Sequence, residues 1–416
     1  MITRRRFVEQ ATAGVVGAVS ARSWGAAGAS PSPGQIKSVI RRDDTILRLG
    51  GDGDNFHMTW AADDRQLVAV CDGRGWSQGP MTLNNCRLWS IRGSSQEARF
   101  EEIENYPTKP IRDRSFPYHC YGTLALDGYI YQYLNAFFRG AKLIYSPDNG
   151  RTWCNQDGST PVVWETEAQQ SRKSLVFFNE PQHAFSLLTI LQMGKNYEYN
   201  RDGHIYVYSP NGMTDGTMNE LVMFRVPKGR ILDRGAYEYF AGCDVSGSPS
   251  WIKDVDDRAV VHTFPRGWVN KSLHPYAWQP SVVYNAPLDQ YLMANWGMGC
   301  APNGAWFGKP SYLGFWTAPK PWGPWTQIYE EAQWMPGNDT KARAYQPQIA
   351  PKWIAPDGKS FWLVWTDFQH TSEFWAVIDK ALATKSDEEF ARLMERARRD
   401  RPYYSFNTQR VDLVLG

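Results

Sequence analysis

Long apolar runs, paired cysteines and an excess of one charge are all missing from this chain. No segment beyond the first thirty residues is apolar enough to hold the protein in a membrane. The six cysteines are dispersed and form no CxxC pair, which argues against a zinc framework and against a dense disulfide scaffold. The 45 basic and 43 acidic residues leave a net charge of +2, so bulk charge suggests neither nucleic acid nor an acidic membrane surface as a partner.

The N-terminal residues 1–29 have the features of an export signal. Thr3–Val8 carries a twin-arginine signature, Ala11–Val19 is a weakly apolar run, and Ala27–Ala29 offers small residues for cleavage. We therefore expect a periplasmic or secreted protein. Residues 30–37 form a Ser/Pro/Gly linker, and residues 38–416 are expected to form a single catalytic domain.

The composition favours many short strands over long helices. Aromatic residues make up 14% of the chain, and 35 Gly with 26 Pro imply frequent turns. Strand–turn–strand units recur along the sequence, and the clearest two contain Gln279-Pro280 and Gln346-Pro347, 67 residues apart. Similar units occupy residues 56–71, 118–133 and 187–208.

These repeats predict an all-β seven-bladed β-propeller, with six blades as the alternative. Roughly 380 residues divided by blades of about 55 residues give seven. Tyr145–Trp153 matches the Asp-box (Ser-x-Asp-x-Gly-x-Thr-Trp), a hairpin turn that recurs on propellers, with Trp packed beneath it. Only Asp387–Arg399 has helical spacing, and we expect one short peripheral helix there. The final strand, Arg410–Leu415, is expected to complete a blade begun near 38–49 and so close the ring.

Propellers bind ligands where the starts of the inner strands and their loops converge. Polar and aromatic residues at such positions form the predicted site. The candidates for catalysis are His57, Tyr118, His119 and Tyr237. The candidates for substrate binding are Lys195, Tyr197, Arg201, Arg234, Trp278, Gln279, Arg343 and Gln346. We name no metal ligand and expect no required cofactor, although a structural calcium ion in the central channel is compatible with the fold.

The bias of this set toward His, Tyr and Arg suits β-elimination at a uronic acid. Glycoside hydrolysis ordinarily uses two carboxyl groups, and paired carboxylates are not prominent at the predicted inner-strand starts. Elimination needs cationic groups on the C6 carboxylate and a His or Tyr that removes the C5 proton. We expect His57 to transfer the proton, and the candidate clamps for the carboxylate are Arg201, Arg234 and Arg343.

Three segments carry a resemblance to a known group of enzymes: Asp54–Trp60, Gly194–Gly203 and the single Asp-box. They resemble secreted seven-bladed propellers that act on the rhamnosyl-glucuronic acid ends of plant gum arabinogalactans. That group contains L-rhamnose-α-1,4-D-glucuronate lyases and related α-L-rhamnosidases. By position, the resemblance implies that His57 is the catalytic residue.

The sequence is therefore interpreted as that of an exported polysaccharide lyase that cleaves the rhamnose–glucuronate linkage. We expect a monomer that acts on an acidic plant or algal polysaccharide or oligosaccharide. An α-L-rhamnosidase or another exo-glycoside hydrolase on the same scaffold is the enzyme alternative, because no motif separates a lyase from a hydrolase. A non-catalytic sugar-binding propeller is the alternative without chemistry.

Overall fold

The structure is a computed structural model that describes most of the chain after the predicted export segment. The described residues are 35–78, 86–108, 118–136, 139–213, 217–265, 278–302, 306–369, 374–399 and 403–416. The predicted export signal, residues 1–29, and residues 30–34 of the linker lie outside them. The first strand begins at Ile36, two residues before the start predicted for the domain.

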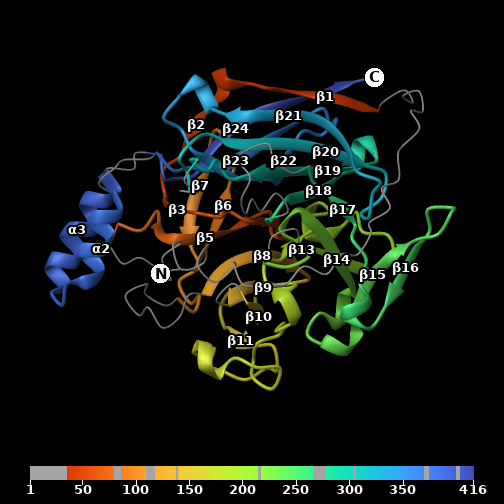
Figure 1. Ribbon diagram of the computed structural model, residues 1–416, viewed down its shortest axis with the longest axis horizontal. Coiled ribbons are helices and arrows are strands. Elements are labelled where there is room, and N and C mark those ends of the chain that lie inside the picture. The colour runs from red at the N-terminus through yellow and green to blue at the C-terminus, as the bar shows by residue number, and fades with distance from the viewer. Residues whose placement is uncertain are drawn as a thin grey trace.

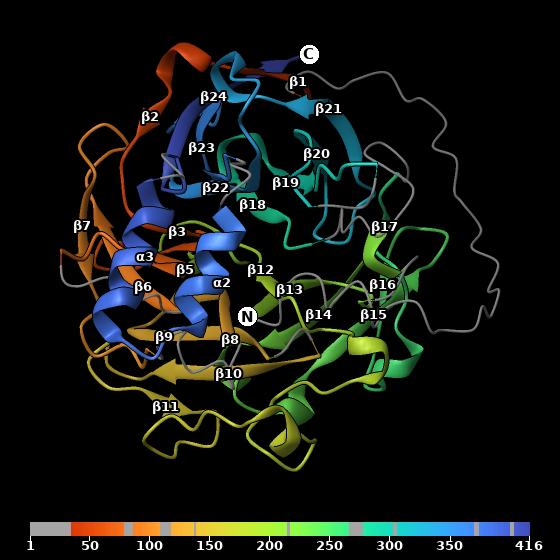
Figure 2. The same cartoon turned by 60° about the vertical axis from the view of Figure 1, so that its left-hand side comes forward.

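Five antiparallel sheets form a closed ring, so the fold is a five-bladed β-propeller with two C-terminal helices, and the prediction of seven blades is wrong (Figure 2). Blade I contains β3 (Asp52–Asp54), β4 (Met58–Trp60), β5 (Gln66–Gly75), β6 (Arg87–Arg92) and β7 (Arg99–Glu102). Blade II contains β8 (Tyr118–Leu126), β9 (Tyr129–Ala136), β10 (Gly140–Ser146) and β11 (Cys154–Asn155). Blade III contains β12 (Thr189–Ile190), β13 (His204–Pro210), β14 (Glu220–Pro227), β15 (Glu238–Cys243), β16 (Pro249–Ile252) and β17 (His262–Thr263). Blade IV contains β18 (Ser281–Asn285), β19 (Gln290–Gly297), β20 (Ser311–Ala318) and β21 (Thr326–Trp334).

Blade V joins the two ends of the described chain. It contains β22 (Ala344–Ile354), β23 (Ser360–Asp367), β24 (Asn407–Leu415), β1 (Ile36–Arg41) and the short β2 (Leu47–Arg48). Strand β1 pairs antiparallel with β24, with Ile40 opposite Asp412. The predicted closure of the ring is therefore confirmed, and Figure 1 shows β1 beside β24 at the C-terminal end.

The blades are longer than the prediction assumed, which explains the miscount. Blade III extends outward through β15, β16 and β17, beyond the usual four strands. Two helices, α2 (Phe374–Ala383) and α3 (Asp387–Arg399), are inserted between β23 and β24. The prediction of α3 is confirmed at both ends, because its buried Phe390, Leu393 and Met394 follow helical spacing. Helix α2 was not predicted.

The Asp-box has the structure that its sequence predicts. It joins β10 to β11, and Asp148 accepts hydrogen bonds from the backbone N–H groups of Arg151 and Thr152 at 3.1 and 2.8 Å. The Ser146 hydroxyl accepts from Gly150 N at 2.8 Å, and Gly150 has a φ of 99°, which a side chain would disfavour. Trp153 is buried below the loop against Tyr106.

The apolar core lies between neighbouring blades, and a further aromatic cluster lies at one end of the hub. This end cluster unites Tyr121, Trp278 and Tyr345 from three blades with Val377 and Met394 of the two helices. Figures 1 and 2 show α2 and α3 standing on that side of the ring. None of the cysteines, all six of which lie in the described ranges, forms a disulfide.

No helix in the described part of the chain is long and apolar enough to cross a membrane.

Candidate functional site

All five inner strands run in the same direction, so their starts gather at one end of the hub. We call this end the hub mouth and define it by Asp54, His57, Asp72, His119, Tyr121, Gln279 and Gln346. The inner strands contact one another around the ring, from β4 to β8, β12, β18 and β22 and back to β4. The opposite end, which we call the far end, is formed by the turns after these strands, including Ala61–Arg65 between β4 and β5.

Three residues with left-handed backbone conformations lead the chain into inner strands at the mouth. Asn55, Gln279 and Gln346 have φ values of 56°, 55° and 54°. Such values are uncommon outside glycine, and strained conformations of this kind concentrate at functional sites. The repeat read from the sequence thus brings equivalent side chains together, because Gln346 Nε2 donates to Gln279 Oε1 at 2.8 Å. Both predicted glutamines lie at the mouth.

His57 is buried at the mouth as a neutral imidazole. Its side chain turns away from its neighbours Phe56 and Met58, which pack into the cluster between blades I and V. The ring lies 5.7 Å from that of Tyr121 on β8, and Nε2 has no hydrogen-bond partner among the described residues. Burial lowers the pKa of His57 to about 3. The imidazole is therefore uncharged near neutral pH, and the same burial makes it a weak base.

Asp54 is a buried carboxylate held by two phenols from distant parts of the chain. Its Oδ2 accepts from the Tyr345 hydroxyl at 2.6 Å and from the Tyr404 hydroxyl at 3.0 Å. Hydrogen bonds donated to a carboxylate favour its charged form. The same Tyr404 hydroxyl lies 3.5 Å from the backbone oxygen of Asp72, so Asp54 and Asp72 are near neighbours.

Asp72 and His119 form the more exposed side of the mouth. Asp72 Oδ1 lies 3.8 Å from His119 Nε2 and 4.0 Å from Cys71 Sγ. The φ of 52° at Asp72 interrupts the alternation of side chains between the two faces of β5, so the side chains of Cys71 and Asp72 lie on the same face. The His119 ring stacks on Tyr121 at 6.3 Å. Burial, followed by nearby charges that include Asp54 and Asp72, raises the pKa of Tyr121 well above its usual value.

Cys71, Asp72 and His119 could also hold a metal ion, and we call them the three-donor group. Their ligand atoms lie within 4.8 Å of one another, in the one such group found within the described residues. Thiolate, imidazole and carboxylate together suit zinc better than calcium or magnesium. The sequence analysis missed this group because Cys71 and His119 are far apart in the chain and form no recognisable spacing.

The segment that contributes Lys195, Tyr197 and Arg201 lies at the far end, not at the mouth as predicted. Lys195 Nζ is 3.4 Å from Asp64 in the turn after β4, and the Tyr197 ring is buried. Arg201 Nη2 is 3.4 Å from the Tyr284 hydroxyl at the end of β18. The cause is chain direction, since this segment follows the inner strand β12 and does not precede it.

Arg234 and Tyr237 lie on the outer side of the ring between blades II and III. Arg234 donates to Glu180 Oε1 at 3.0 Å, stacks on Phe178 at 4.1 Å and lines a cleft of about 540 Å³. Tyr237 is buried, hydrogen-bonds to Tyr133 and donates to a backbone oxygen at 2.6 Å. Neither reaches the mouth, because β14 carries the chain outward before this segment.

Tyr118, Trp278 and Arg343 are near inner-strand starts but are engaged elsewhere. Tyr118 alternates away from His119 and donates to Glu165 Oε2 at 3.0 Å. Trp278 is buried in the end cluster, with its ring 6.1 Å from that of Trp296. Arg343 donates to three backbone oxygens, those of Phe307, Thr340 and Ala342. Thus none of the three arginines proposed as carboxylate clamps faces His57.

Comparisons with known proteins give matches among solved structures alone. No protein-family model matches the chain, and no curated protein matches it. The chain is similar to the α-L-arabinofuranosidase of Podospora anserina crystallised with cellotriose, at 10% identity over 91% of this chain and 95% of that one, with a TM-score of 0.42. It is similar to the catalytic domain of the α-L-arabinofuranosidase of Coprinopsis cinerea, at 9% identity over 92% and 98%, with a TM-score of 0.43.

A third similar structure is the xyloglucan PUL GH43B protein of Bacteroides ovatus, at 12% identity and a TM-score of 0.43. The match covers 80% of this chain but 51% of that protein, so the chain spans about half its length. At these values the similarities carry no argument about activity. The number of blades rests on the strand pairing alone, and it departs from the seven-bladed group that the sequence motifs resemble.

Proposed function

We propose that this protein is a carbohydrate-active enzyme of the glycoside hydrolase class, with its active centre at the hub mouth. One observation carries the proposal: two carboxyl groups, Asp54 and Asp72, meet the two imidazoles of His57 and His119 at one end of the hub. Hydrolysis of a glycosidic bond requires two carboxyl groups or their equivalents, one to stabilise positive charge and one to move a proton.

The two carboxyl groups differ in their surroundings and therefore in their roles. Asp54 is buried and held by two phenol donors, so it supplies a fixed negative charge for the oxocarbenium-like transition state. Asp72 is partly exposed beside His119, and this pair carries the proton to and from the glycosidic oxygen. The buried fixed charge and the partly exposed acid–base pair thus lie next to each other at the hub mouth.

Elimination at a uronate, the first interpretation from the sequence, is the second candidate. The ring of His57 lies 5.7 Å from that of Tyr121, which favours elimination, because an imidazole and a phenol are the groups that exchange a proton with C5 of a uronate. The lowered pKa of His57 counts against it, since a weak base removes that proton poorly. Against it, Arg201, Arg234 and Arg343 are engaged away from His57, so the C6 carboxylate lacks the predicted cationic partners. For either reaction we propose an exported enzyme acting on plant or algal polysaccharide side chains.

Product analysis separates the two reactions. The protein is incubated with rhamnosyl-glucuronate oligosaccharides and with a panel of aryl glycosides. Hydrolysis of the aryl glycosides is followed by the phenol that it releases. On the rhamnosyl-glucuronate oligosaccharides, hydrolysis releases rhamnose with no ultraviolet signal, whereas elimination releases rhamnose together with the absorbance of an unsaturated uronate. Release of sugar without that absorbance supports the proposal, and an absorbance increase in step with release contradicts it.

The site is tested by removing the fixed charge. Asp54→Asn is expected to lower kcat by roughly 10²–10⁴-fold, the range for loss of a catalytic group. Asp64→Asn is the matched control, because Asp64 lies in the turn at the far end and pairs with Lys352. Activity of Asp54→Asn within a few-fold of that of the control would remove the hub mouth as the active centre.

A further inference from the structure

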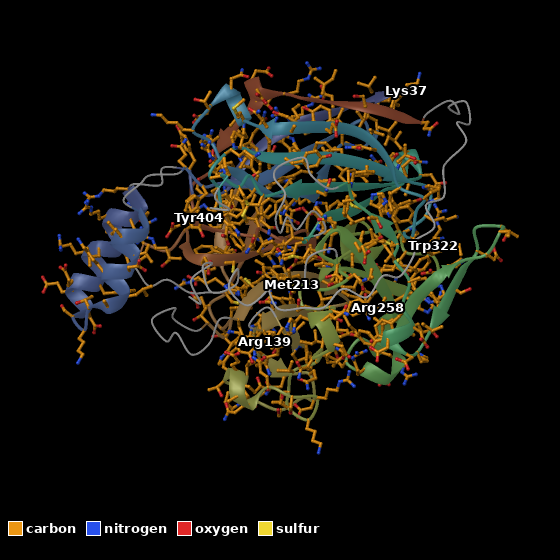
Figure 3. All side chains as sticks on the ribbon, viewed as in Figure 1. Lys37, Arg139, Met213, Arg258, Trp322 and Tyr404 are labelled. Atoms are coloured by element: carbon orange, nitrogen blue, oxygen red, sulfur yellow. The ribbon has the colours of Figure 1, made fainter. Side chains whose placement is uncertain are left out.

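A second polar and aromatic cleft lies at the far end, between blades III and IV. Three separate connections form it: the segment from β12 to β13, the turn from β18 to β19, and the segment after β20. Its volume is about 180 Å³, which is the size of one sugar ring. Figure 3 shows Trp322, one of its lining residues, on the side of the molecule opposite Tyr404 of the hub mouth.

Aromatic rings from each of these connections line the cleft. Tyr199 is 41% exposed, and its ring lies edge-on to that of Tyr284 at 6.4 Å. Tyr284 in turn packs against Tyr291 at 4.9 Å. On the other wall the ring of Tyr206 lies 6.3 Å from that of Trp322. Tyr206 and Tyr284 are themselves buried, so the ring surface open to a ligand is that of Tyr199, Tyr291 and Trp322. Flat apolar surfaces of this kind pack against the C–H faces of sugars.

Charged groups of both signs stand among these rings. The Tyr284 hydroxyl donates to Asp289 Oδ1 at 2.5 Å and lies 3.4 Å from Arg201 Nη2. Asp202, which also lines the cleft, accepts hydrogen bonds from Tyr206 and from Asn200 Nδ2, the latter at 3.1 Å. These bonds fix two carboxylates and one guanidinium in place before a ligand arrives, which lowers the entropy cost of binding.

We propose that this far-end cleft is a non-catalytic binding site for a single uncharged sugar residue of a polysaccharide. Sugar hydroxyls need acceptors and donors at short spacing, and Asp202, Asp289 and Arg201 supply both. The lining charges balance, since Arg201 and Lys320 face Asp202 and Asp289, so a neutral sugar fits better than a uronate. Only the class of ligand, a sugar, rests on the proposed function.

Two sites at opposite ends of the hub give the protein two contacts with one polymer. A long chain held in the far-end cleft keeps the enzyme close to its substrate, which raises the effective concentration at the hub mouth. A short oligosaccharide cannot reach both ends and gains nothing from the cleft. The consequence is measurable: cleft variants lose binding and turnover on polymers but keep turnover on small glycosides.

Binding is tested directly with the full protein carrying Asp54→Asn, so that no substrate is consumed. Affinity electrophoresis in gels with a neutral arabinogalactan is compared with gels containing polygalacturonate. Retardation in the neutral polymer is expected, and Tyr199→Ala and Trp322→Ala are each expected to reduce the association constant about tenfold, which corresponds to about 1.4 kcal/mol. Tyr129→Ala is the matched control, because Tyr129 is a comparably exposed tyrosine on blade II. Circular dichroism confirms that each variant is folded.

The outcomes separate the two proposals. Loss of retardation in the cleft variants but not in the control supports the cleft, even if the hub mouth hydrolyses nothing. Retardation that is unchanged in both cleft variants, or reduced equally in the control, overturns the cleft even if hydrolysis is confirmed. Stronger retardation in polygalacturonate than in the neutral polymer would also overturn the assignment of an uncharged sugar.

Discussion

Acidification is expected to destabilise this protein through His57. The native pKa is about 3, whereas an unperturbed histidine has a value of 6.5. As the pH falls below 6.5 the unfolded chain binds a proton that the native imidazole does not, so unfolding becomes more favourable. The neutral His57 contributes its full stabilisation of the native state above pH 6.5, and this contribution declines as the pH falls toward 3. Each pH unit in that window costs about 1.4 kcal/mol, which gives a loss of about 2 kcal/mol between pH 7 and pH 5.

The assay compares urea unfolding of wild type and His57→Met at pH 7 and pH 5. Methionine has a similar volume and no titrating group, so the variant should lose about 2 kcal/mol less on acidification than wild type does. His262, whose pKa burial lowers to about 4, gives an independent repeat of the test through His262→Met. Asp367 acts in the opposite direction, because burial raises its pKa to about 6, but its contribution cancels in the comparison.

Parallel losses for wild type and His57→Met would refute the reasoning. That result would mean that the imidazole titrates in the native state as it does in water. The hub mouth would then be hydrated around His57, and the neutral base required for elimination would not exist below neutral pH.

Three further predictions test the mouth and its support. Tyr404→Phe removes one of the two hydrogen-bond donors to Asp54, so the acidic limb of the kcat/KM profile should move to higher pH, as measured from pH–rate profiles. An unchanged limb would mean that Asp54 does not control activity. Treatment with EDTA should leave hydrolysis unchanged, and activity lost to EDTA and restored by zinc would instead assign the three-donor group as a metal site. Lys142→Met leaves Glu165 buried without its cation and should lower the free energy of unfolding by about 3–5 kcal/mol. Adding Glu165→Gln to this variant should restore part of the loss, because the unpaired buried charge is then removed. Equal urea midpoints for wild type and Lys142→Met would contradict this prediction.

The local units of the fold were predictable because their signals lie within a few residues. The strand–turn–strand repeats at 56–71, 118–133, 187–208, 277–296 and 344–365 each hold the inner pair of one blade. There are five such units, so the repeats themselves gave the better blade number. Dividing the chain by an average blade length failed because β15–β17 and the two helices add residues that contribute no blade.

The candidate site could be predicted only for those residues whose position follows from the direction of the inner strands. His57, His119, Gln279 and Gln346 stand at inner-strand starts and lie at the mouth. The buried carboxylate Asp54 was overlooked, because its partner Tyr404 is 350 residues away and no local pattern links them. Asp72 was not among the candidates, and the left-handed backbone there brings it beside His119.

The pairing of β1 with β24 has a consequence for how the polypeptide is made. The first strand of the domain leaves the ribosome long before its partner exists, and the ring cannot be completed until the last nine-residue strand has been synthesised. Until then the edges of β24's neighbours are exposed, and such edges invite pairing with other chains. A chain that stops before Asn407 lacks β24 and would therefore form an open ring prone to self-association.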